Sequence, residues 1–115
     1  MESFLNALKS HAAALDGMAG QARARGARFL VVIFPIFHRV GGAGYPLKAV
    51  HADLVRSLAA RGVDALDLQP AYAGRADEEL WVDPADQHPN DVAHAIAAEQ
   101  VRQWLVQHDA LPGCR

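Results

Sequence analysis

The chain has a single cysteine among its 115 residues, Cys114, close to the carboxyl terminus. One cysteine can form neither an intrachain disulfide nor a thiolate metal cluster, so we expect a reduced thiol at a frayed end. An excess of charge is also missing, because the formal net charge is −2 and no stripe of Lys and Arg accompanies the aromatic residues. The sequence therefore argues against a disulfide-stapled fold and against nucleic acid as a partner.

Long apolar runs are absent too. The longest extends from Phe29 to Phe37, well short of the roughly 18 to 20 residues that cross a bilayer. The amino-terminal segment has no basic stretch followed by an unbroken apolar one, as a signal peptide would. We therefore expect a cytoplasmic chain with no membrane partner, and the sequence says nothing about the compartment of a longer parent protein.

The composition is that of one globular domain, with 51% apolar and 21% charged residues. Apolar residues at helical spacing from Phe4 to Ala22 predict an amphipathic helix that Gly26 ends. The next segment, Phe29 to Phe34, is apolar without alternation, which is typical of a central parallel strand covered on both faces. Pro35 stops this strand.

The same order of helix, glycine and strand then repeats. Pro46 is expected at the first position of a helix that Gly62 ends, and Val63 to Leu68 is expected as a strand nearer an edge. A loop from Gln69 to about Gln87, with a short turn around Ala76 to Leu80, precedes a last helix from Pro89 to about His108. The order α-β-α-β-α predicts a parallel sheet with helices on its faces.

Two strands make a sheet that consists only of edges. An apolar strand at an edge is an aggregation site. We therefore expect the sheet to be completed by a missing amino-terminal part, by a partner chain or by self-association with a second copy.

Ligands of open parallel sheets bind where the strand-to-helix loops gather. Of these loops only Asp83 to His88 concentrates titratable groups. In an extended backbone Asp86 and His88 lie on one side, so that the carboxylate can fix the tautomer of the imidazole. An ordinary helix start, with Pro89 at the first position and Asp91 in the first turn, explains the same residues. The local pattern leaves both interpretations open.

The segment "DQHPNDVAHAIAAEQVRQWL" resembles the carboxyl-terminal block of the SGNH/GDSL hydrolase family, in which Asp and His of a Ser-His-Asp triad precede Pro-Asn. Two upstream segments, "FLVVIFPIF" and "GVDALDLQPAYAG", resemble strands of that family, so that the resemblance covers about Ala27 to Leu105. It implies a three-layer α/β/α flavodoxin-like fold, of which residues 1–115 would be the carboxyl-terminal part of a single domain. It further implies hydrolysis of small-molecule esters without a cofactor.

Carried over from the family, His88 would be the general base and Asp86 the residue that orients it. The commoner family pattern has its Asp three residues before the His, where this sequence has Ala85, and Asp83 is the alternative acid. The "GDS"-type nucleophile turn and the oxyanion blocks of the family have no counterpart here, and Ser3, Ser10 and Ser57 fall inside helical patterns. We therefore expect the isolated chain to be inactive as an esterase. The alternative is a non-catalytic α/β module that completes its sheet with a partner.

The remaining motifs carry weaker expectations. The glycine-rich segment "RVGGAGYP" lacks both the dinucleotide and the phosphate-loop patterns, which favours a substrate-side loop with Phe37, His38 and Tyr45 as pocket residues. His88 and His94 lie six residues apart rather than four, so we expect no metal site. Two tryptophans are expected to be packing residues, namely Trp81 and Trp104.

Overall fold

A computed structural model describes residues 2–111 of the protein, without the side chains of residues 2–5 and 8; Cys114 lies outside the described residues. The elements follow in the order α1 (Glu2–Ala24), β1 (Leu30–Ile33), α2 (Lys48–Ala60), β2 (Asp64–Asp67), the 3-10 helices η1 (Gln69–Tyr72) and η2 (Asp77–Glu79), β3 (Trp81–Asp83), β4 (Asp86–Pro89) and α3 (Asp91–Gln107). No helix within residues 2–111 combines the length and the apolar character needed to cross a membrane.

Glycines end the first two helices, as the sequence predicted. Gly26 and Gly62 have φ angles of 69° and 71°, in the left-handed region. This conformation reverses the chain, so that the amide of Ala27 donates to Ala22 and that of Val63 donates to Leu58. Glycine adopts it without the steric cost that a Cβ atom would add.

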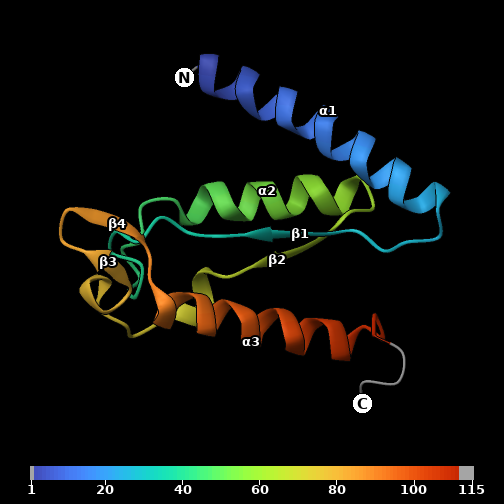
Figure 1. Ribbon diagram of the computed structural model, residues 1–115. Coiled ribbons are helices and arrows are strands. Elements are labelled where there is room, and N and C mark those ends of the chain that lie inside the picture. Colours follow the sequence, from blue (N-terminus) through green and yellow to red (C-terminus); the bar gives the residue numbers. More distant parts are fainter. Residues whose placement is uncertain (1, 112–115) are drawn as a thin grey trace.

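The two predicted parallel strands pair with each other. Leu30 lies opposite Asp64, and the register continues to Ile33 opposite Asp67. Val31 of β1 packs on one face against a core that includes Leu58 of α2. Val32 packs on the other face with Ala93 and Ala97 of α3. Figure 1 shows α2 and α3 on opposite sides of the strands, which makes the chain a mixed α/β structure built around a small parallel sheet.

The stretch from Gln69 to Gln87 is not the long loop that the sequence predicted. It contains two 3-10 turns, of which η2 matches the turn expected around Ala76 to Leu80, and an antiparallel hairpin of β3 and β4. Three-residue and four-residue strands with charged and apolar residues mixed carry no clear period, so the hairpin left no sequence signal.

Both prolines that were expected to open helices lie before them. Pro89 closes β4, and α3 begins at Asp91 with Asn90 as its N-cap. Pro46 precedes Leu47, which is the N-cap of α2. Proline suits the turn at position 46 and the strand end at position 89, because its ring fixes φ and each position precedes a helix.

The sequence predicted β1 as a central strand, but within residues 2–111 it pairs with β2 alone. Each of the two strands therefore keeps one free edge in the described part of the chain. The rest of the expected sheet is not among these residues.

The loop that follows β1 is fixed to the segments that follow β2. The carboxylate of Asp77 accepts from the amides of Arg39 and Val40 at 2.6 and 3.0 Å. The indole of Trp81 donates to the carbonyl of Phe37 at 2.6 Å. These bonds gather the connecting segments at the carboxyl ends of both strands, where Figure 1 shows the hairpin as well.

The backbone of Gly41 lies close to that of Arg75 and Gly74. Its carbonyl accepts from the amide of Gly74 at 2.7 Å, and a Cβ atom built on Gly41 would lie 2.0 Å from the carbonyl oxygen of Arg75. We expect Gly41→Ala to lower the free energy of unfolding by about 1–3 kcal/mol, because backbone atoms must move apart. Urea denaturation measures this loss.

The neighbouring Gly42 is the matched control. A Cβ atom there meets nothing closer than 3.9 Å, so Gly42→Ala should leave the urea midpoint nearly unchanged. Equal effects of the two substitutions would contradict the described backbone contact between Gly41 and Arg75.

Candidate functional site

Asp86 and His88 form a hydrogen-bonded pair on β4. Because β4 is extended, the two side chains lie on the same side of the strand. The Nδ1 atom of His88 lies 2.6 Å from Oδ1 of Asp86, and the backbone amide of His88 donates to the same oxygen at 3.1 Å. The His88 side chain is 87% exposed and that of Asp86 is 45% exposed. The imidazole is therefore held at one nitrogen and presented to solvent.

Asp83, the other acid that the sequence offered, has a different partner. Its Oδ1 atom accepts from the amides of Ala85 and Asp86 at 2.7 and 2.8 Å. These bonds close the turn between β3 and β4, in which an aspartate side chain bonds backbone groups two and three residues ahead. Asp83 shapes the turn, and Asp86 is the acid in contact with His88.

The pair is electrostatically coupled. The hydrogen bonds that Asp86 accepts from the ring and from the amide of His88 lower the pKa of the Asp86 carboxyl group. An ionised Asp86 can only accept, so Nδ1 of His88 carries the hydrogen. Nε2 of His88 is then left with a lone pair, and no residue of the described part bonds to it. This is the arrangement of a proton acceptor.

Asn90, and not His88, caps α3. The side-chain oxygen of Asn90 accepts from the amide of Ala93 at 3.0 Å, and its side-chain nitrogen donates to the carbonyls of Glu79 and Trp81 at 2.8 and 2.9 Å. These three bonds join the helix start to η2 and β3. The start of α3 and the Asp86-His88 pair therefore lie next to each other in the sequence but depend on different residues.

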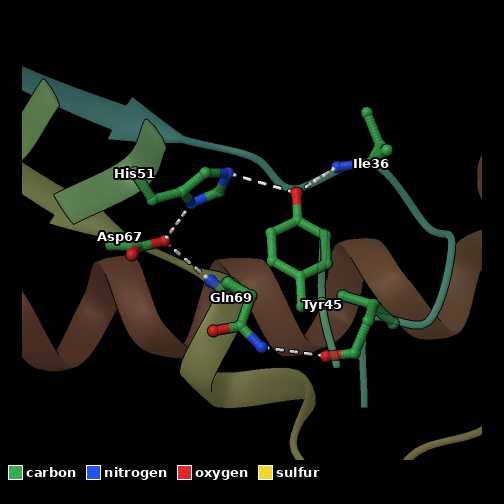
Figure 2. A network of polar contacts seen from close by, with 6 residues as sticks. Ile36, Tyr45, His51, Asp67 and Gln69 are labelled. Carbon is green, nitrogen blue, oxygen red and sulfur yellow. Dashed lines mark hydrogen bonds and ion pairs between the residues drawn. The ribbon is translucent and has the colours of Figure 1, made fainter. Parts of the chain in front are cut away.

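A second Asp-His pair lies in the core and was not predicted as a site. Nδ1 of His51 lies 2.8 Å from Oδ1 of Asp67, and Nε2 lies 3.2 Å from the hydroxyl of Tyr45 (Figure 2). The hydroxyl oxygen of Tyr45 also accepts from the amide of Ile36 at 3.0 Å. A neutral His51 with its hydrogen on Nδ1 satisfies every one of these groups.

The histidine and the tyrosine of this network are buried, while the Asp67 side chain is partly exposed. His51 is 6% exposed and Tyr45, expected as a pocket residue, is 3% exposed. Burial raises the pKa of the Tyr45 hydroxyl, and the charge of Asp67 raises it further against the opposing effect of the Ile36 amide. Asp67 also accepts from the amide of Gln69, so the network joins the loop after β1, α2 and the end of β2. No period or motif singles out these residues, because their contact is created by the crossover.

The two pairs differ in their free nitrogen. Nε2 of His51 is occupied by Tyr45 inside the core, whereas Nε2 of His88 points to no described residue. Of the two histidines, His88 alone has a nitrogen available to an external group.

The other predicted contact residues lie on the loop after β1. Phe37 is 4% exposed and packs edge-on against the ring of Tyr72, while His38 is exposed. A cavity of about 310 Å³ opens beside this loop and is lined by Arg39, Gly41, Gly42, Gly44, Arg75, Ala76 and Asp77. A substrate contact at Phe37 or His38 stays a prediction.

The tryptophans pack as expected. Trp104 is buried and Trp81 lies against the core with its indole hydrogen bonded to Phe37. Among residues 2–111, His, Cys, Asp and Glu form no cluster of three or more that would hold a metal ion.

A scan against protein-family models and searches of the curated proteins and the solved structures found no match for this chain. The resemblance to the SGNH/GDSL family therefore depends on the quoted motifs alone.

Loss of the Asn90 cap and loss of the Asp86-His88 pair should have different effects on stability. Asn90→Ala removes three hydrogen bonds and should lower the free energy of unfolding by about 1–2 kcal/mol, the upper range for an N-cap. His88→Ala removes an exposed ring and should change it by less than about 0.5 kcal/mol. Urea denaturation followed by circular dichroism compares the two. A large loss in His88→Ala would mean that His88 serves the fold.

The pairing of Asp86 also has a pH signature. Its pKa in the folded protein should lie below the ordinary value of 3.8, which a titration of the carboxyl carbon by NMR measures. Because the folded pKa is the lower one, the pair stabilises the fold at pH values above the unfolded pKa, and this contribution disappears as the pH falls through the folded pKa. In His88→Ala the Asp86 pKa should return toward 3.8. An unchanged pKa in that variant would contradict the contact.

Proposed function

We propose that this chain supplies the histidine and the acid of a serine hydrolase of the SGNH/GDSL type that acts on small-molecule esters. The observation that carries the proposal is the state of His88, whose Nδ1 is held by Asp86 at 2.6 Å while the ring is 87% exposed. An imidazole with a fixed tautomer and an open Nε2 is what a hydroxyl nucleophile needs as its base.

The reaction follows from these positions. Nε2 of His88 takes the proton as a serine oxygen attacks the ester carbonyl, and Asp86 stabilises the imidazolium that forms. His88 then returns the proton to the leaving alcohol, and water hydrolyses the acyl-enzyme by the same relay. Apart from the hydrolytic water, the chemistry uses protein groups alone.

The serine is proposed to come from outside the described residues. Ser10 and Ser57 lie exposed on α1 and α2, and neither forms a hydrogen bond with His88 in the described part of the chain. The proposal includes a larger flavodoxin-like sheet with helices on both faces, which the positions of α2 and α3 support. The 115-residue chain alone is expected to be inactive, because the members of a triad act as a unit.

The reading frame upstream of Met1 provides the test. If it encodes a "GDS" turn, the extended protein should hydrolyse p-nitrophenyl acetate and react with a fluorophosphonate that labels activated serines. His88→Ala should reduce kcat by several orders of magnitude, on the order of 10⁴-fold or more. Asp86→Ala should lose somewhat less.

Two controls accompany this series. His94→Ala removes another exposed histidine, at the start of α3, and should keep full activity, which excludes hydrolysis by surface imidazoles. Asp83→Ala disturbs the turn but leaves the acid of the pair. Full activity in His88→Ala, or the lack of an upstream nucleophile turn, would overturn the proposal.

A second candidate function is a non-catalytic α/β module that completes its sheet by association. The free edges of β1 and β2 in the described part of the chain favour it.

A further inference from the structure

The free edge of β1 carries unpaired backbone groups. The amide of Leu68 donates to the carbonyl of Ile33, so the backbone groups of Ile33 point toward β2. Backbone groups alternate in direction along an extended strand, which turns those of Leu30 and Val32 to the free edge, followed by those of Phe34. A row of donors and acceptors at this spacing is satisfied by another β-strand.

This edge is apolar and uncharged. Leu30, Val31 and Val32 are only half-buried, although such a strand is usually covered completely. Phe34 and Ile36 at its carboxyl end are 44% and 48% exposed. The edge therefore offers both hydrogen-bonding groups and apolar surface to a partner strand.

The free edge of β2 has the opposite character. β2 carries Asp64 and Asp67 within four residues, and Asp64 is exposed. Two copies joined through β2 would bring carboxylates together, and charged residues at an edge oppose such pairing. Charge therefore selects β1 over β2 as the edge at which two identical chains can meet.

We propose that β1 pairs in an antiparallel manner with β1 of a second copy, about a two-fold axis at Val32, to form a four-stranded sheet. Antiparallel neighbours that lie opposite each other share a face. Val32 packs on the α3 side, and the ring of Phe34 lies 6.0 Å from that of His94 in α3. Leu30 shares this face by alternation, so Phe34 of the partner subunit covers Leu30.

The inference gives the second candidate function its partner and does not rest on the hydrolase proposal. It concerns the 115-residue chain itself, whereas the activity test uses the extended protein. A negative result in one test therefore does not decide the other.

Analytical ultracentrifugation of the chain over a range of concentrations tests the dimer. We expect twice the 12.4 kDa mass of the chain. Val32→Pro removes an amide that points to the free edge of β1 and spares the bonds to β2, so it should weaken dimerisation by about 100-fold or more. Ala65→Pro is the matched control, because Ala65 lies in β2 opposite Val31 and its amide points to the other free edge. This variant should dimerise normally.

A monomer at every concentration, an undefined larger aggregate, or a Val32→Pro variant that still dimerises would overturn the proposal. A folded but monomeric Ala65→Pro variant would also overturn it, because that substitution leaves the edge of β1 unchanged. If circular dichroism shows that Val32→Pro does not fold, hydrogen exchange of the unmodified chain decides. The amides of Leu30 and Val32 should be protected at high concentration and lose protection on dilution, and fast exchange at both concentrations would contradict the pairing.

Discussion

The parallel pairing of β1 with β2 is the constraint on which the rest of the structure depends. Parallel strands bring their carboxyl ends to the same edge of a sheet and require a crossover between them. Here the crossover is α2, and the segments that leave both strands meet at one end of the molecule (Figure 1). The contacts of His51 with Tyr45 and Asp67 follow from this arrangement.

The two Asp-His pairs consist of the same residue types but differ in their hydrogen bonds. His51 bonds at both ring nitrogens and joins three segments that are distant in the sequence. His88 bonds at one nitrogen and keeps the other open. An imidazole with both nitrogens bonded in the core holds a structure together, whereas one with a free nitrogen can exchange a proton with a bound molecule. The difference lies in burial and not in the residue types.

The hairpin of β3 and β4 turns a helix start into a candidate site. Asp83 accepts hydrogen bonds from the backbone of the turn, and Asn90 accepts one from the first turn of α3. Neither side chain therefore bonds to the imidazole of His88. What remains between them is the extended run from Asp86 to Pro89, in which the spacing of two residues brings a carboxylate and a ring together. The sequence signals of a helix start therefore indicated α3, and the spacing of Asp86 and His88 indicated their contact.

The sequence by itself determined the helices, the two parallel strands, the glycine stops and the contact between Asp86 and His88, because each depends on local spacing or backbone preference. Its interpretation of Pro89 as the first helical residue was wrong by two positions, since the side-chain amide of Asn90 donates to η2 and β3, which the local pattern does not reveal. Only the tertiary structure decided that Asp83 serves a turn, that Tyr45, His51 and Asp67 meet, and that Phe37 is buried. The contacts of His51 and the burial of Phe37 depend on segments that the crossover brings together, and chain spacing carries no information about them. The role of Asp83 depends on the hairpin, which the sequence did not predict.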